Sequence, residues 1–549
     1  MTNHSYLALF GSIILVLLVL VKSRQKPQLP FPPQPPSRFI VGHLSDVIRE
    51  NKAKRWHLHL AAWARQYGPI FGVRIGHIVD YYINTDQYVK EIFDKRSAQT
   101  ANRPLWLMSS HILNNDFNTL FLDASDPTWK NQRKVINILL TNVQRAEKIV
   151  PLLEFETLKF LHESVTDPAG GLAGAHMFRA IGRYTYSVFS TVLMGMNVPN
   201  SDDPVIDFIK ETEFQITNTF PGSNIIDLLP SLQKLPLFLK PWERRGHSRY
   251  QRDLEWALKR LEKVKQLMSE GDPSIGNSFL GSALQDASLM GFSCKEELAI
   301  LAFALIGAAA DTTRMTTWSF VEAMMIFPEV QKRAQAEVDK VVGDRIPMWD
   351  DFEKIPYIRM AMKEVWRWRP PVALGHPHVT ARDMQVGEYF LPKGARIHIN
   401  SYAIGHDPCR HDDPEQFRPE RYANDHTTTM ESMNAKDVTQ RDHFAFGAGR
   451  RVCPGYHVAE RSSAIAMMRM LWAFNITFIP DTKMPLNFTD YAGNIPGNPG
   501  DDMPARLVYR SEERKNLILD TYEKEDAARP HVEPLNMGEK SFKTPESYL

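Results

Sequence analysis

The sequence contains few cysteines and no excess of either charge. Its 549 residues include only Cys294, Cys409 and Cys453, too few and too scattered for a disulfide framework. Lysine and arginine together number 65 against 64 aspartates and glutamates, so no overall field attracts a nucleic acid or an acidic polymer. We therefore expect a protein of a reducing compartment that binds no nucleic acid.

The rest of the composition predicts a large globular unit. Hydrophobic residues make up 43% of the chain and charged residues 23%. No glycine-serine linker or internal repeat interrupts residues 38–507, so we expect one large domain there rather than two. Residues 508–549 are strongly charged and then proline-bearing, and we predict that this C-terminal extension is poorly ordered.

The N-terminus predicts a single membrane-spanning anchor. Residues 6–21 are uncharged and nearly all apolar, so residues 1–25 are a candidate membrane segment. Lys22, Arg24 and Lys26 follow this stretch and no lysine or arginine precedes it, which places the rest of the chain in the cytosol. The alternative, a cleaved signal peptide, requires a positive start and a small-residue cleavage site. The prolines of residues 26–37 predict a stiff spacer.

Helical patterning dominates the region after the spacer, and a short strand-like stretch covers residues 68–85. The longest helical signal is residues 296–327, which are apolar nearly all round and end at Pro328. A helix of this kind runs through the core of a protein rather than over its surface.

The centre of this predicted helix combines small and polar residues. Ala308, Ala309 and Ala310 leave a groove for a bulky group, and Asp311 and Thr312 follow directly. In the alternative interpretation, the alanines only pack tightly and the threonine bonds the carbonyl four residues earlier. A buried aspartate is harder to explain in that way.

Cys453 lies in an unusual setting, the stretch FGAGRRVCPG of residues 446–455. Two arginines precede it and Pro454 and Gly455 follow, which predicts a shaped loop entering a helix and surroundings that stabilise a thiolate. A zinc site with His443 or His457 lacks a second nearby cysteine. A nucleophilic cysteine lacks an obvious general base.

Two further groups of charged residues lie between these features. Glu364 and Arg367 are spaced to share one helix face, and Arg421 follows Pro419 and Glu420 in a predicted loop. Each group alone is typical of ordinary surface pairing, worth roughly a few tenths of a kcal/mol.

Together these motifs resemble the cytochrome P450 superfamily of heme-thiolate monooxygenases, most of all its fungal microsomal members. The family's cysteine loop, Phe-x-x-Gly-x-Arg-x-Cys-x-Gly, corresponds to Phe446, Gly449, Arg451, Cys453 and Gly455. Its Trp-x-x-x-Arg, Glu-x-x-Arg and Pro-Glu-Arg motifs correspond, in the family's order, to Trp129–Arg133, Glu364–Arg367 and Pro419–Arg421. The resemblance implies a mainly α fold, with a large helical domain around heme and a small β-sheet region near its N-terminal part.

The resemblance also implies roles for individual residues. Cys453 corresponds to the thiolate ligand of the iron in heme b. Thr312 and Asp311 correspond to groups that organise water for proton delivery during oxygen activation, and Ala309 stands where the family usually has glycine. The other residues implied to contact the cofactor are Phe446, Gly449, Arg451, Trp129, Arg133 and His378. A structural network on the same side of the heme as the cysteine is formed by Glu364, Arg367 and Arg421.

Partners follow from the same resemblance. The sequence has no dinucleotide fingerprint, so electrons come from NADPH through a membrane-bound cytochrome reductase. The reductase would dock on a basic face made of Lys130, Arg133, Lys134, Arg450 and Arg451. The implied enzyme is a monomer in the endoplasmic reticulum membrane, with its catalytic domain in the cytosol.

The substrate is expected to be a lipophilic small molecule, oxidised with O2 in secondary metabolite biosynthesis. Residues 220–242 resemble a loop that roofs the pocket and touches the membrane, although a buried core loop is the alternative. The residues expected to line the pocket are Ala308, Ala309, Val372, Ala373 and Leu374. Two alternatives remain open: oxidation of xenobiotics or lipids, and a membrane-tethered heme protein without turnover.

Overall fold

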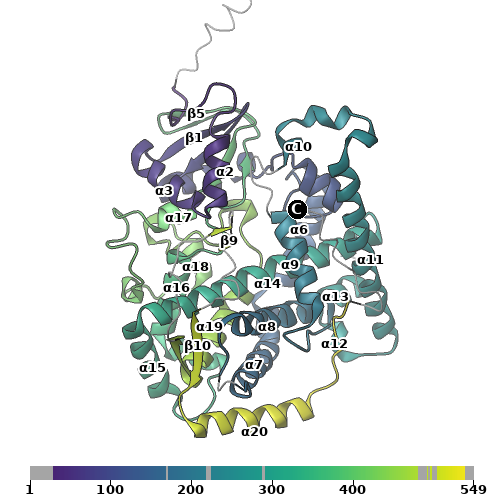
Figure 1. Cartoon of the computed structure of the whole chain (residues 1–549), viewed down its shortest axis with the longest axis vertical. Helices are drawn as coiled ribbons and strands as arrows, with labels where there is room; N and C mark the ends of the chain where they lie inside the picture. Colours follow the sequence, from purple (N-terminus) through teal and green to yellow (C-terminus); the bar gives the residue numbers. More distant parts are fainter. Residues whose placement is uncertain are drawn as a thin grey trace, which may run out of the picture.

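The computed structural model describes residues 29–168, 171–217, 224–286, 291–479, 491–492, 495–496 and 504–537. The predicted anchor and the first residues of the spacer lie outside these ranges. The described chain is mostly helical with small sheets, as predicted (Figure 1).

The long helices form the larger part of the molecule. They are α2 (Leu44–Lys52), α3 (Trp56–Tyr67), α6 (Pro127–Leu140), α7 (Val143–Val165), α8 (Gly174–Met194), α9 (Pro204–Thr217), α11 (Pro241–Ser269), α14 (Lys295–Ile326), α15 (Pro328–Val342), α16 (Pro356–Trp368), α19 (Tyr456–Ala473) and α20 (Glu512–Ala528). Shorter helices are α4 (Asp86–Val89), α5 (Ser97–Thr100), α10 (Ile225–Leu228), α12 (Pro273–Gly276), α13 (Phe279–Gln285), α17 (Ser401–Gly405) and α18 (Thr429–Met433). Single helical turns connect them, including η2 (Leu107–Ile112), η3 (Pro230–Lys234), η4 (Leu237–Leu239) and η9 (Gly449–Arg451).

A four-stranded sheet lies near the N-terminal part of the domain, in the order β1-β2-β6-β3. The hairpin of β1 (Ile70–Ile75) and β2 (Ile78–Ile83) occupies the predicted strand-like stretch and pairs Ile70 with Ile83. β6 (Arg396–Ile399) runs parallel to β2, and β3 (His378–Val379) is antiparallel to β6. The two-stranded sheets are β4 (Met384–Val386) with β5 (Tyr389–Leu391), β7 (Phe474–Phe478) with β10 (Ala505–Tyr509), and β8 (Tyr491–Ala492) with β9 (Ile495–Pro496).

α14 is the central helix, and its bounds agree with the predicted core helix to within one residue. It packs against α8, α11 and α19, and Pro328 starts the next helix. Among the described residues α14 alone is long and apolar enough to cross a membrane, but most of it is buried inside the protein. It is therefore a core helix, as the absence of a polar face predicted.

The C-terminal extension differs from its prediction. β10 crosses the expected boundary at residue 507, and α20 follows it with Ser511 as its N-cap. Arg510 and Arg514 both pair with Asp339 of α15, at 2.6 and 3.0 Å, and Ile518 is fully buried. The charges that suggested a poorly ordered tail therefore hold a helix onto the domain. Residues 538–549 lie outside the described part.

Candidate active site

The cysteine loop enters α19, as predicted, because the helix begins three residues after Cys453. The amide of Cys453 donates to the carbonyl of Phe446 at 2.9 Å and closes the loop. Gly449 has a φ of +65°, and a Cβ atom there would lie 1.9 Å from the carbonyl oxygen of Phe93. Only glycine fits this close approach, so the motif glycine is required by the fold.

Cys453 lies deep in the protein, although the residue as a whole keeps part of its surface accessible. Burial raises its pKa, while the amide of Gly455 and the charge of Arg133 act in the opposite direction. The described residues contain no group of three or more histidine, cysteine, aspartate or glutamate side chains that could hold a metal ion. The zinc alternative therefore has no ligand set there, and a metal on Cys453 needs a cofactor to complete its coordination.

Three guanidinium groups form a positive cluster next to this loop. Arg451 donates from Nε to the carbonyl of Ala101 at 2.8 Å and stacks 4.4 Å from the ring centre of Trp129. Arg133 donates to the carbonyl of Val452 at 2.5 Å, and Trp129 lies one turn before it on α6. Arg103 donates from Nε to the carbonyl of Leu120 at 2.9 Å.

The positive charge of this cluster is only weakly compensated. Burial lowers the pKa of Arg103 well below its usual value, and the charges of Arg451 and Arg133 lower it further. Burial also lowers the pKa of Arg451 to about 9, although Asp123 opposes the change. Among the described residues none of the three arginines forms an ion pair within 4 Å. A cationic site of this kind, with Arg103 buried and Arg133 and Arg451 partly exposed, fits a ligand that carries acidic groups, such as the two propionates of heme.

Arg103 was missed by the sequence analysis. It lies in the loop before η2, in the stretch ANRPLW, where an arginine before a proline gives no specific signal. Only the fold shows that its guanidinium joins the two arginines of the motifs.

His378 lies in β3 beside this cluster. Its Nδ1 is 2.7 Å from the carbonyl of Thr100 and must carry the proton, and its ring contacts Phe93 edge to face. Burial and the charge of Arg103 lower its pKa well below the usual value. Neutral His378 therefore offers Nε2 only as an acceptor, which makes it a weaker carboxylate partner than the arginines unless an anion restores its charge.

A stripe of accessible side chains interrupts the buried course of α14. Ala308 is exposed and Ala309, Asp311 and Thr312 are partly exposed, whereas Ala310 and Thr313 are buried. Small side chains and accessible surface in mid-helix give a flat or bulky ligand a place to lie against. This exposure pattern is compatible with the predicted groove, which stays a prediction.

The two polar residues of the stripe already have partners. Thr312 donates from Oγ1 to the carbonyl of Ala308 at 3.0 Å, which is the back-bonded alternative considered from the sequence. Asp311 accepts at Oδ1 from the hydroxyl of Tyr186 at 2.6 Å and pairs with Arg314 at 2.7 Å. Neither partner of the acid was identified from the sequence.

Glu364, Arg367 and Arg421 meet in the interior rather than at the surface. Glu364 accepts two bonds from Arg367, at 2.6 and 2.7 Å, and a third from Arg421 at 3.1 Å. The side chains of Glu364 and Arg367 are fully buried. On the same helix, α16, the ring of Trp366 lies 4.9 Å from that of Phe446, so the network adjoins the cysteine loop.

The predicted pocket residues separate into two groups. Ala308, Ala309 and Val372 keep accessible surface. Ala373 and Leu374 are instead buried in an apolar cluster with residues of α3 and β1. The segment after α16 turns these two side chains toward the N-terminal sheet, and their place in the pocket stays a prediction.

The predicted basic face also divides. Lys130, Lys134 and Arg450 are exposed, whereas Arg133 and Arg451 point into the positive cluster. Three of the five charges are therefore available at the surface.

A cysteine loop before a helix, a cationic cluster beside it and a stripe of small residues on the core helix are the features expected of a heme-thiolate protein. The family model for cytochrome P450 matches residues 32–497. A cytochrome P450 monooxygenase of Gibberella fujikuroi is 46% identical over 95% of this chain and 96% of its own length. The cytochrome P450 monooxygenase virE of Hypocrea virens is 33% identical, covering 93% and 91%.

A solved zebra fish cytochrome P450 structure with progesterone has the same fold, with a TM-score of 0.65 and 23% identity over 83% of this chain and 99% of that chain. The chain belongs to the cytochrome P450 family. It is a heme-dependent monooxygenase, and the family takes electrons from NADPH through a reductase.

Proposed function

We propose that this enzyme oxidises a lipophilic small molecule in fungal secondary metabolism, with Cys453 as the thiolate ligand of its heme. The observation that carries the residue assignment is the partly exposed Cys453, just before α19, beside the guanidinium groups of Arg103, Arg133 and Arg451, which form no ion pair with the described residues. When bound, thiolate-ligated heme supplies the activation of O2.

The surrounding residues hold the cofactor in this proposal. Arg103, Arg133 and Arg451 bind the propionates, and Trp129 supports Arg451 through its ring. His378 is an additional propionate partner, because its ring can donate a hydrogen bond from Nε2 to a propionate once it is protonated. Phe446 and Gly449 shape the loop, and the buried network of Glu364, Arg367 and Arg421 keeps Trp366 against it.

Asp311 and Thr312 are the proposed proton-handling groups. The hydroxyl of Thr312 can turn from the carbonyl of Ala308 toward a water molecule in the groove. Asp311 exchanges protons with that water, while Tyr186 and Arg314 fix its carboxylate. The methyl group of Ala309 narrows the groove beside them.

The substrate is proposed to bind along the accessible part of α14, near Ala308, Ala309 and Val372. Their side chains are small or aliphatic, so the hydrophobic effect favours the binding of a lipophilic ligand. Secondary metabolism is supported by the fungal monooxygenases that this chain resembles.

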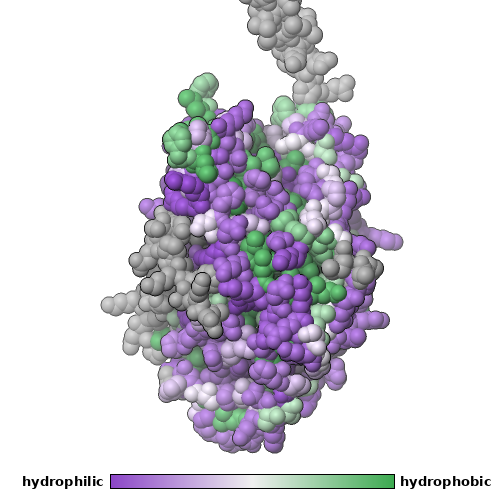
Figure 2. All heavy atoms as spheres, turned by 90° about the vertical axis from the view of Figure 1, so that its right-hand side faces the viewer, coloured by the Kyte–Doolittle hydropathy of each residue, from purple (hydrophilic) through white to green (hydrophobic). Residues whose placement is uncertain are grey.

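Membrane attachment is supported by exposed apolar residues in two segments. Phe39 and Ile40, before α2, are 94% and 77% exposed, and Phe238 in η4 is 71% exposed. α2 and α10 lie at the same end of the molecule in Figure 1, and apolar atoms gather at that end in Figure 2. We propose that this end rests on the endoplasmic reticulum membrane, with residues 1–25 as the anchor and the domain in the cytosol.

Reductase docking is proposed on the exposed charges Lys130, Lys134 and Arg450. These side chains lie on α6 and the cysteine loop, close to the proposed ligand of the iron. An acidic surface on the reductase would be steered to them, and its binding would weaken with salt.

Two measurements test the proposal. The reduced protein with carbon monoxide should show the red-shifted Soret band of a thiolate-ligated heme. Microsomes that contain the protein and a reductase should then convert a component of a fungal metabolite extract, with consumption of NADPH. A normal Soret band without NADPH consumption would instead support a heme protein without turnover.

A further inference from the structure

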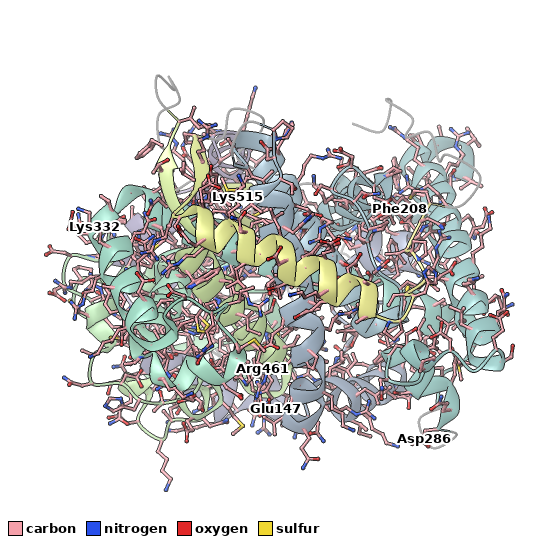
Figure 3. The ribbon with its side chains drawn as sticks, turned by 90° about the horizontal axis from the view of Figure 1, so that it is seen from below. Glu147, Phe208, Asp286, Lys332, Arg461 and Lys515 are labelled. Atoms are coloured by element: carbon pink, nitrogen blue, oxygen red, sulfur yellow. The ribbon has the colours of Figure 1, made fainter. Side chains whose placement is uncertain are left out.

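The segment after α20 connects three parts of the molecule that are distant in sequence. α20 itself crosses the underside of the domain (Figure 3) and packs on α7. The ring of Tyr522 stacks on Phe155 and His162 of α7, with centroid distances of 6.1 and 4.1 Å. The guanidinium of Arg529, after the last turn, lies 3.9 Å from the ring centre of Phe155. The chain therefore leaves α20 in a fixed direction.

The next residues pair with the loop that follows α8. The amide of Asn197 donates to the carbonyl of Glu533 at 3.0 Å, and the amide of Leu535 donates to the carbonyl of Asn197 at 2.6 Å. Leu535 is fully buried in the main apolar core. A main-chain bridge and a buried leucine hold this part of the extension to the domain.

The same residues also reach α11. Arg260 donates from Nη2 to Oδ1 of Asn536 at 3.2 Å, and Lys263 pairs with Glu533 at 3.4 Å. Arg260 is largely buried, and burial lowers its pKa to about 10. Its side chain also stacks 4.4 Å from the ring centre of Trp256.

Trp256, which stacks with Arg260, also contacts two other helices. Its ring lies 5.3 Å from Phe208 of α9 and 4.9 Å from Phe303 of α14. The C-terminal segment therefore contacts α11, the helix that packs between α9 and α14 through Trp256. α11 directly follows the exposed apolar turn η4.

We propose that residues 529–537 form a strap that fixes α11 to the loop after α8, and so limits the outward movement of α11 and of the segment 225–239. The inference rests on the proposed function in one respect, because it assumes that ligands reach α14 past this segment. A strap at the base of α11 would set how often the segment 225–239 moves away from α14 and admits a ligand, without contacting the ligand itself.

The test compares two strap variants with a matched control. E533A/N536A removes the side-chain contacts to α11, and L535A empties a buried position. The control E523A/K524A changes two exposed residues of α20 that form no hydrogen bond or ion pair with the described residues of the strap or of α11. All three are measured as full-length, heme-loaded proteins.

Hydrogen exchange of peptides from α11 should become roughly fivefold faster in E533A/N536A, the change expected from the loss of about one hydrogen bond, and faster still in L535A. Exchange in α16 and α19 should stay at parent values, as should all exchange in the control.

The association rate of 4-phenylimidazole, followed by the shift of the Soret band, should rise with the exchange of α11. Unchanged exchange in both strap variants, or faster exchange with unchanged association, would overturn the strap. Failure of the proposed function would appear separately, as the absence of a thiolate-type spectrum in the parent protein.

Discussion

The hydroxyl of Tyr186 donates a hydrogen bond of 2.6 Å to Oδ1 of Asp311. Tyr186 belongs to α8, so this bond crosses from one helix to the middle of α14. Arg314 contributes a second contact, at 2.7 Å, to the same oxygen. The acid that we propose for proton delivery is therefore fixed from the side of α8.

Tyr186→Phe should loosen this acid without removing it. The lost bond to a charged group is worth about 1.5–3 kcal/mol, so the carboxylate should sample more orientations. We expect less product per NADPH, by roughly 10- to 160-fold in the limit where the whole bond energy serves orientation, and a changed solvent isotope effect.

The matched control is Tyr184→Phe, since Tyr184 is also buried in α8 but donates to the carbonyl of Ser462. Equal losses in both variants would mean that Tyr186 only supports the packing of α8.

Cys453→Ser should abolish the thiolate-type carbon monoxide spectrum and all monooxygenase activity. A neutral hydroxyl cannot replace an anionic sulfur that donates electron density to the iron. Cys409→Ser is the control, because Cys409 is exposed and lies outside the site. Retention of both the spectrum and turnover in Cys453→Ser would contradict the assignment.

Much of the fold and the cysteine loop could be predicted because local rules decide them. The apolar run before Pro328 identified α14, and the motif around Cys453 requires Gly449, where any Cβ atom would collide with Phe93. These positions depend on residue type alone, so a pattern in the sequence is sufficient.

The remaining features depend on contacts between distant segments. Arg103 joins the cationic cluster through the fold of a loop that carries no motif. Ala373 and Leu374 have the apolar character of pocket residues, but the turn after α16 directs them into another cluster. The charged C-terminal segment is ordered because Asp339 pairs with two of its arginines, which no local pattern shows.

Arg103→Met should act in opposite directions on the two forms of the protein. Without heme, the variant removes a buried charge that has no ion pair among the described residues, so the apoprotein should have a higher Tm. With heme, a propionate partner is lost, so the cofactor should dissociate faster.

Thermal unfolding of the apoprotein and transfer of heme to apomyoglobin measure the two effects of Arg103→Met. The exposed Arg244→Met is the control and should change neither. Unchanged heme transfer would show that Arg103 does not serve the cofactor. A lower Tm of the apoprotein would show that the hydrogen bonds of Arg103 to the carbonyls of Leu120, His376 and Pro377 outweigh the cost of its buried charge.

Asp227 should make the contact between α10 and η2 depend on pH. Its carboxylate accepts a hydrogen bond from the amide of Met108 at 3.2 Å, and the residue is 4% exposed. Burial raises its pKa to about 6, while the amides of Met108 and Leu107 and the charge of Arg396 oppose the rise.

Because the folded pKa is raised, the stability that Asp227 contributes is fully present below its unfolded pKa and is lost as pH rises through about 6. The loss is at most about 3 kcal/mol. Asp227→Asn keeps a neutral acceptor, so its Tm should exceed that of the parent above pH 6 and approach it near pH 4. A difference in Tm that does not vary with pH would refute this assignment.

Thr312→Ala tests whether the hydroxyl in the groove handles protons or only completes the helix. The structure shows Oγ1 bonded to the carbonyl of Ala308, and this bond alone would make the residue dispensable for chemistry. If the hydroxyl instead turns to hold a water, its loss should leave heme and substrate binding intact but divert NADPH electrons into hydrogen peroxide.

The loss of one proton-handling group typically slows the step it serves by ~10²- to 10⁴-fold, and water held by Asp311 would reduce that effect. The measurement is product and peroxide formed per NADPH oxidised, with matched reductase. Thr317→Ala is the control, because its Oγ1 donates to the carbonyl of Thr313 in the same helix, but its side chain is buried away from the stripe. An unchanged product ratio in Thr312→Ala would assign the hydroxyl to the helix alone, because a group that delivers protons to the groove must change that ratio when it is removed.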